Sequence, residues 1–232
     1  LSYKNNESNN VKKASIFLLI FICCQGVFGY LTVSLKLLPI IVTAHLFGGF
    51  TTLCLFFYLF IISGNFDLLN RMKVANIKLL SGLSFFILIV QIFLGVWTST
   101  NYASLACADF PTCHGTYLPD MDFKQGFNLF QEVGPNYLYG LLDNPARVAI
   151  HYSHRVSAII VTIVFLALIS KLWFSKAAPL ASTLGLLLLT QITLGIINVV
   201  YVLPLYVAIA HNLIAACLLI TILVINYLAW KK

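Results

Sequence analysis

Six long apolar runs dominate this 232-residue sequence and limit what it can fold into. Each reaches the roughly 20 residues that an α-helix needs to cross the hydrocarbon core of a bilayer. Lipid offers no partners to backbone N–H and C=O groups, and the runs are too long for barrel strands, so each is predicted to be a transmembrane α-helix. The predicted spans are residues 14–35, 37–62, 79–100, 148–169, 180–202 and 205–230.

The composition agrees with an all-α membrane protein. Hydrophobic residues make up 60% of the chain and charged residues only 9%, which is outside the range of soluble domains. The net charge of +7 does not indicate a nucleic-acid-binding protein, because the basic residues lie between the spans rather than in one patch.

The basic residues predict the orientation of the chain in the membrane. If the spans alternate, ten of the 14 Lys and Arg residues fall on one side: Lys4, Lys12, Lys13, Arg71, Lys73, Lys78, Lys171, Lys176, Lys231 and Lys232. The positive-inside rule then places both termini in the cytoplasm. The segment 101–147 becomes an outer loop, long enough to cap the helix ends.

An internal repeat relates the two ends of the chain. A Gln, a Gly four residues later and a His 20 residues after the Gln occur twice, as Gln25, Gly29 and His45 and as Gln191, Gly195 and His211. In each copy a turn with a proline separates the two predicted helices. Agreement to the residue indicates a duplication.

Gln91 and Gly95 form a weaker third copy, with no histidine at the matching distance. Ordinary helix packing through small residues is the alternative explanation for the glycines. If residues 79–232 form one four-helix unit, then residues 1–78 match only its second half. We therefore expect that an equivalent of the third and fourth helices preceded Leu1 and was lost from this chain. A duplication that was never complete is the alternative.

Four of the five histidines lie inside predicted spans. They are His45, His151, His154 and His211, and the fifth, His114, lies in the loop. Ionisable side chains within a membrane are rare and usually functional, although a histidine satisfied by a helix carbonyl is the alternative. At 1.5 Å per residue, His45, His151 and His211 lie about 9–10 Å below their helix starts and His154 about 14 Å.

Imidazoles at a common depth on neighbouring helices suit bis-histidine haem ligation. Zinc would require three or four ligands, and the spans contain no carboxylate. Arg155, beside His154, is a candidate partner for a haem propionate. A haem held by a histidine of the fourth helix and His211 would therefore account for these costly side chains; spacing alone does not choose between His151 and His154.

Cys107 and Cys113 lie close together in the predicted outer loop. In an oxidising compartment such a pair is expected to form a disulfide. A redox-active pair and a metal site with His114 remain alternatives. The other four cysteines lie in spans, where they are expected to act as small apolar residues.

The sequence resembles the heme A synthase family, in its Gram-negative bacterial form, over essentially everything after residue 10. The residues that carry the resemblance are QGVFGYLTVSLKLLPIIVTAHLFGGF, QIFLGVWTSTNYASLACADFPTC, NPARVAIHYSHR and LPLYVAIAHN. The family oxidises the C8 methyl group of haem O to the formyl group of haem A for terminal oxidases, in the bacterial inner membrane.

The resemblance implies two halves, each with a histidine pair. Residues 79–232 would be the cofactor half, with haem b iron on His154 and His211 and Arg155 beside it. Residues 1–78 would be the remainder of the substrate half, in which His45 receives haem O. Haem O synthase, as the supplier of haem O, and a second copy of the chain are the expected protein partners.

This chain departs from the family at one essential point. The first half of the family carries a Glu-x-x-His-Arg motif whose glutamate is required for the oxidation, and no such motif is present. His151 takes the place of that glutamate in HYSHR, and all seven acidic residues lie outside the predicted spans. No catalytic residue is therefore assigned here, and little or no turnover is expected from this chain alone.

Two other functions remain open. A bis-histidine haem b electron carrier would hold permanent haems in both halves, but His45 has no visible partner for a second site. A transporter or an assembly scaffold with structural histidines would explain the repeat but not the matched depths.

Overall fold

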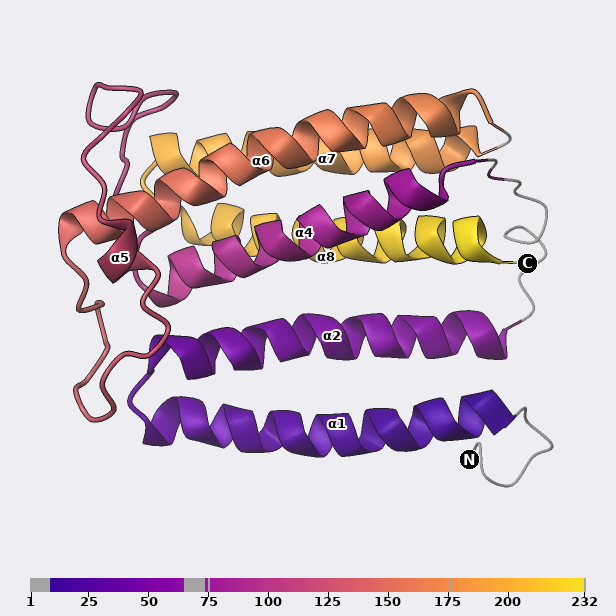
Figure 1. The fold of residues 1–232 in the computed structure, drawn as a ribbon, viewed down its shortest axis with the longest axis horizontal. Coiled ribbons are helices and arrows are strands. Elements are labelled where there is room, and N and C mark those ends of the chain that lie inside the picture. The colour runs from indigo at the N-terminus through magenta and orange to yellow at the C-terminus, as the bar shows by residue number, and fades with distance from the viewer. Residues whose placement is uncertain (1–8, 65–73, 75, 176, 232) are drawn as a thin grey trace.

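The computed structural model describes residues 9–64, 74, 76–175 and 177–231. Six long helices run back and forth along the molecule, and a long loop covers one end of them (Figure 1). The helices are α1 (Asn9–Ser34), α2 (Pro39–Ser63), α4 (Lys78–Thr100), α6 (Asn144–Trp173), α7 (Ala178–Val200) and α8 (Leu205–Trp230), with a single turn, α5 (Phe123–Gly126), in the loop. All six long helices have the length and apolar composition to cross a membrane, as the sequence predicts.

The predicted spans are confirmed, and their bounds shift by a few residues. Helix α1 begins five residues before its predicted start, and α6 extends the predicted span by four residues at each end. Helix α6 begins at Asn144 with Asp143 as its N-cap residue, but the Asp143 carboxylate accepts a 3.0 Å hydrogen bond from Gln125 instead of capping the helix. Figure 1 shows that α6 reaches farther toward the loop than α8 does.

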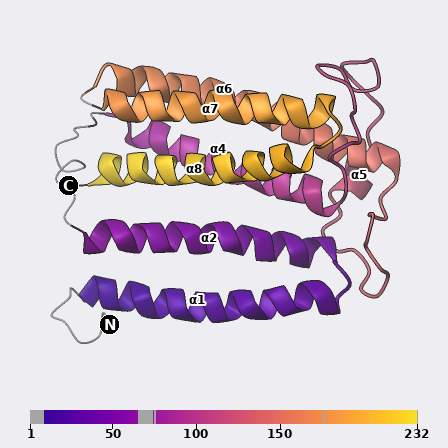
Figure 2. The same ribbon diagram turned by 180° about the vertical axis from the view of Figure 1, so that it is seen from behind.

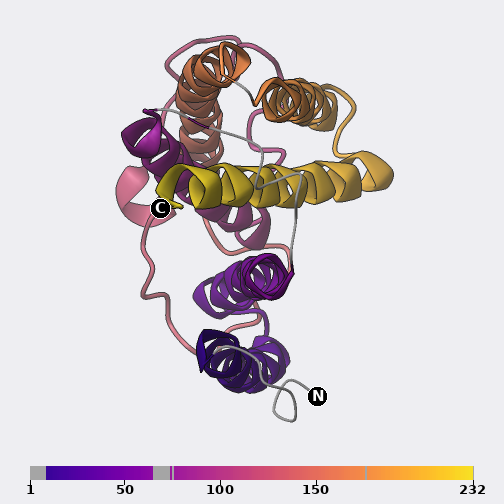
Figure 3. The same cartoon turned by 90° about the vertical axis from the view of Figure 1, so that its right-hand side faces the viewer.

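Helices α4, α6, α7 and α8 form a bundle, seen from behind in Figure 2. Their closest packing lies in the half away from the loop, where Phe165, Leu184 and Ile222 are fully buried. Helix α2 packs on α4 and α8, and α1 packs on α2 (Figure 3). The α1–α2 hairpin thus lies beside a four-helix unit, with α1 outermost.

Three helices end in the same backbone structure, which supports the repeat. In α1, α4 and α7 the chain closes with a Schellman motif, in which an N–H bonds to the carbonyl oxygen five residues earlier. The three bonds are Leu37 to Thr32 at 2.8 Å, Ala103 to Thr98 at 2.9 Å and Leu203 to Asn198 at 2.7 Å. These residues occupy equivalent positions relative to Gln25, Gln91 and Gln191. The third copy therefore extends to the end of its helix.

The turns themselves use residues that rarely adopt a positive φ. Lys36, Tyr102 and Val202 have φ values of 51°, 54° and 58° at the same position of the motif. A positive φ is most unfavourable for a β-branched residue, so Val202 is strained there. The α1–α2 and α7–α8 turns then lead directly into helices, whereas Ala103 leads into the long loop.

The long loop contacts both the four-helix bundle and the α1–α2 hairpin. Its second half crosses to the α1–α2 turn, where the Tyr137 N–H donates to the Lys36 carbonyl at 3.1 Å and Lys36 Nζ donates to the Gly134 carbonyl at 3.3 Å. Closer to the bundle, the Trp97 indole N–H donates to the Gly126 carbonyl at 2.9 Å. The loop thus covers the ends of α4 and α6 and the neighbouring hairpin.

Candidate functional site

His154 lies on α6 with its ring against α4. A Cβ atom added to Gly95 would lie 3.0 Å from the ring carbon Cε1, so the glycine makes room for the imidazole. The Gln91 side-chain Nε2 lies 3.1 Å from His154 Nδ1. The third Gln–Gly pair therefore does have a histidine, on the helix that follows the long loop.

His211 lies on α8 in the same arrangement against α7. A Cβ atom on Gly195 would lie 3.3 Å from its ring carbon Cε1, and Gln191 Nε2 lies 3.1 Å from His211 Nε2. Helix α4, which carries the glycine and glutamine beside His154, packs on both α6 and α8. The structure thus places in one helix bundle the two histidines that the resemblance assigns to iron.

The helices pack loosely around these two rings. In α8 none of residues 205–217 is buried, and in α6 none of residues 152–160 is buried. The close-packed part of the bundle begins beyond them, at Val161 and Leu218. The histidines therefore lie between the loop end of the bundle and its dense core.

The donor set fits a haem. His211 Nδ1 and the Oε1 atoms of Gln91 and Gln191 are buried without hydrogen-bond partners. Among the described residues no cluster of three or more His, Cys, Asp or Glu side chains could hold a metal ion alone. Two imidazoles as axial ligands of a macrocycle are what the geometry offers.

His45 lies apart from this pair, on α2 against α1. A Cβ atom on Gly29 would lie 3.1 Å from its ring carbon Cε1, which repeats the glycine contact of the other two histidines. Gln25, however, lies over Gly48 of α2, and both Gln25 Oε1 and His45 Nδ1 are buried without partners. No other histidine of the described residues is on α1 or α2.

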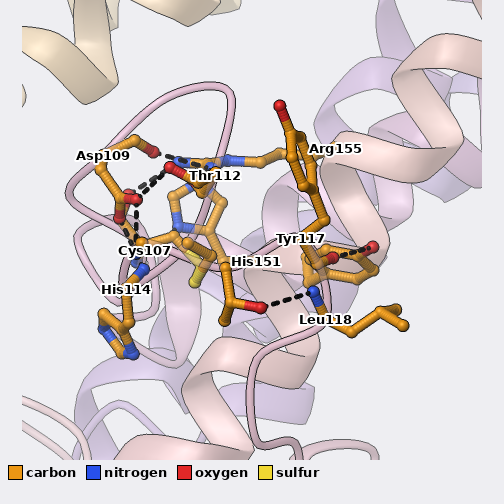
Figure 4. The surroundings of a disulfide bond; sticks show 12 residues. Cys107, Asp109, Thr112, His114, Tyr117, Leu118, His151 and Arg155 are labelled. Atoms are coloured by element: carbon orange, nitrogen blue, oxygen red, sulfur yellow. Dashed lines mark hydrogen bonds between the residues drawn. A yellow bond between two sulfur atoms is a disulfide. The ribbon is translucent and has the colours of Figure 1, made fainter.

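Arg155 points into the disulfide loop. Its guanidinium donates to the carbonyl oxygens of Cys107, Thr112 and Asp109 at 2.7, 2.9 and 3.0 Å (Figure 4). Its Nε lies 3.3 Å from His151 Nε2. Of the five N–H donors that a guanidinium carries, one remains for a propionate or another acceptor.

His151 is 5% exposed and lies under the loop. The Cys107 N–H approaches its Nδ1 at 3.3 Å while Arg155 approaches its Nε2. Because a neutral imidazole accepts through one nitrogen only, one of these two contacts at a time is a hydrogen bond. The sequence offered His151 only as an alternative to His154 for the haem and did not indicate this contact, because Cys107 is 44 residues away in a loop of irregular structure.

Cys107 and Cys113 are joined by a disulfide, and both are buried. Between them, Asp109 accepts hydrogen bonds from the Thr112 hydroxyl at 2.5 Å, the His114 N–H at 2.7 Å and the Gly115 N–H at 2.9 Å. The Thr112 hydroxyl first, then the Gly115 and His114 N–H groups, hold the pKa of the Asp109 carboxyl well below its usual range. Asp109 therefore stays ionised and organises the loop.

Several features lie outside the described residues or away from the site. Of the charges used for the orientation, Lys4, Arg71, Lys73, Lys176 and Lys232 lie outside the described part, as do Glu7 and Asp67. A hollow of about 330 Å³ lined by Tyr58, Asn226 and Trp230 lies near the end opposite the loop and contains no histidine.

Comparison with known proteins shows which family the sequence matches. The sequence model of the COX15-CtaA family, described as cytochrome oxidase assembly protein, matches residues 2–223. A heme A synthase of Shewanella oneidensis is 42% identical over 224 residues, which cover 95% of this chain and 68% of that protein. A heme A synthase of Rickettsia felis is 28% identical over 215 residues, which cover 88% of this chain and 60% of that protein. The chain thus spans about two thirds of the length of these relatives.

Proposed function

Because this chain belongs to the heme A synthase family of cytochrome oxidase assembly proteins, we propose that it holds a haem b between His154 and His211 and takes part in oxidising haem O to haem A. The observation that carries the proposal is the pair of matching histidines. Each ring lies against a glycine and a glutamine of the neighbouring helix, at the loosely packed level of the bundle. This repeated geometry suits two axial ligands.

The bound haem supplies iron that takes up and passes on electrons. The residues of this chain bind and orient it. His154 and His211 would hold the iron from α6 and α8, and Gly95 and Gly195 let the rings stand close to the helix backbones. The loop covers the ends of α4 and α6 on the side of His154.

We assign the substrate haem O to His45. Its ring makes the same glycine contact as the other two, and its Nδ1 has no partner in the described structure. All carboxylates of the described residues lie in the loop, at positions 109, 120, 122, 132 and 143. The family resemblance implies a carboxylate at the substrate site for the oxidation of the methyl group, so this chain by itself is proposed to bind haem b with little or no turnover.

We infer a location in the bacterial inner membrane from the family, and the charge distribution supports an orientation with both termini in the cytoplasm. Among the described residues, the end opposite the loop carries Lys12, Lys13, Lys78, Lys171 and Lys231 and no carboxylate. The positive-inside rule assigns this end to the cytoplasm and the disulfide loop to the outer side. Haem O synthase, as the source of a poorly soluble substrate, and a second copy of the chain are the proposed partners.

Haem extraction tests the activity. The protein encoded by the complete gene and this chain alone are expressed in a bacterium that makes haem O but no haem A, and the membrane haems are separated chromatographically. The proposal predicts haem A with the complete gene, its loss in His45→Ala, and haem b but no haem A with this chain. Haem b with no haem A from the complete gene would favour the alternative, a bis-histidine electron carrier.

A further inference from the structure

Two glutamines occupy matching positions beside the two proposed iron ligands. Gln91 and Gln191 each stand four residues before the glycine that receives the imidazole ring. Each places its side-chain amide 3.1 Å from one ring nitrogen, His154 Nδ1 and His211 Nε2 respectively. The glycine fixes where the ring lies. Gln191 meets a single ring nitrogen of His211, whereas Gln91 Nε2 is nearest to His154 Nδ1 and lies 3.5 Å from its Nε2.

In each pair the side-chain oxygen of the glutamine lacks a hydrogen-bond donor. Gln91 Oε1 and Gln191 Oε1 are buried acceptors without donors. A ring that binds iron through one nitrogen carries a proton on the other, and that N–H needs an acceptor. Rotating the carboxamide by half a turn exchanges its Nε2 and Oε1 and brings the unpartnered oxygen to the ring nitrogen. In Gln91 the same rotation exchanges the 3.3 Å hydrogen bond from Nε2 to the His154 carbonyl oxygen for the bond to the ring N–H.

We propose that Gln91 and Gln191 are positioning residues for the axial histidines, each accepting the ring N–H that faces away from the iron. This inference rests on the proposed haem between His154 and His211. An acceptor on that N–H fixes the tautomer and the ring orientation and raises the basicity of the ligand. A more basic ligand stabilises the oxidised iron, so the glutamines lower the reduction potential of the haem.

The third histidine shows the contrast. Gln25 occupies the equivalent position on α1, but it lies over Gly48, and a Cβ there would fall 2.0 Å from its Nε2. It has no hydrogen bond to His45, whose Nδ1 is unpartnered. The ring of the proposed substrate site is thus held by its glycine alone, which suits a haem that enters and leaves.

Midpoint potentials of the purified, haem-loaded chain test the inference. Gln→Leu at position 91 or 191 keeps a similar volume and removes the acceptor, so the potential is expected to rise and haem transfer to apomyoglobin to quicken by about 10- to 100-fold. Gln→Glu at the same positions keeps an acceptor and makes it stronger, so haem is retained and the potential falls. Gln25→Leu is the matched control and leaves both quantities unchanged.

Three results separate the possibilities. Leu and Glu variants that shift the potential in opposite directions support the inference. Potentials equal to that of Gln25→Leu, or loss of haem from both the Leu and the Glu variant in folded protein, would overturn it. Absence of haem from the folded wild-type chain would instead contradict the haem site on which the inference rests.

Discussion

The guanidinium of Arg155 donates a 2.7 Å hydrogen bond to the carbonyl oxygen of Cys107. This contact joins the residue after His154 to the disulfide loop, across 48 positions of sequence. Two further carbonyl oxygens of the loop accept from the same side chain, and the Phe110 ring lies 5.8 Å from its central carbon. The loop is therefore attached to the helix that carries a proposed iron ligand.

Arg155→Lys is expected to loosen this attachment. A lysine cannot reproduce the spread of donors that meets three carbonyl oxygens, and each lost hydrogen bond to a charged group is worth about 1.5–3 kcal/mol. The Cys107–Cys113 disulfide should then be reduced faster by a phosphine, as followed by thiol labelling. Arg147→Lys is the control, because Arg147 binds the other part of the loop through Leu142 and Gly140. Equal reduction rates in both variants would contradict this role of Arg155.

The glycines beside the proposed haem ligands are expected to tolerate no side chain. In Gly95→Ala or Gly195→Ala the new methyl group meets the ring of His154 or His211 at 3.0 or 3.3 Å and must push it away. The expected result is loss of most of the haem, measured by pyridine extraction. Gly82→Ala on α4 is the control, since nothing lies within 4 Å of its added Cβ and alanine favours a helix by up to about 1 kcal/mol. Full haem content in all three variants would argue against ring placement by these glycines.

A parallel pair tests the substrate site. Gly29→Ala should displace His45, whose ring carbon lies 3.1 Å from the added Cβ, whereas Gly26→Ala meets nothing within 4 Å. In the complete gene product, Gly29→Ala is expected to abolish haem A formation and leave the haem b spectrum unchanged. Equal yields of haem A from the two variants would contradict the assignment of the substrate site to His45.

The disulfide loop is expected to lose stability in acid. The folded-state pKa of Asp109 is lowered by its hydrogen bonds, so its contribution is fully present above the unfolded-state pKa of about 4 and is lost as the pH falls through the folded-state value. Disulfide reduction by a phosphine should therefore quicken below about pH 4 in the wild type. In Asp109→Asn it should already be fast at neutral pH and vary less. Asp120→Asn, in the same loop, should behave as the wild type, and a shared profile for all three proteins would contradict the role of Asp109.

The sequence was sufficient for the six spans, because each is a long and predominantly apolar run, and their ends move by only a few residues in the structure. The matching turns were expected from the repeat, but their positive φ values at Lys36, Tyr102 and Val202 were not. Such values are usually marked by glycine or asparagine, and none of the three positions has either.

The candidate site was predictable only in part. A histidine 20 residues after Gln91 does not exist, and its true neighbour, His154, is 63 residues away. In this copy the long loop takes the place of the short turn. The 20-residue spacing from glutamine to histidine therefore does not hold, although the glutamine, the glycine and the histidine are all present. The Arg155 contacts were beyond sequence reasoning, because they use backbone carbonyl oxygens whose positions depend on how the loop folds.

The reduced-minus-oxidised absorption spectrum of the purified chain, with a pyridine extract to count haem, tests the central claim most directly. The account predicts a low-spin b-type signal near one haem per chain, lost in His154→Ala and in His211→Ala and kept in His45→Ala and His114→Ala. A folded chain without haem, or a haem signal that survives both of the first two substitutions, would contradict it.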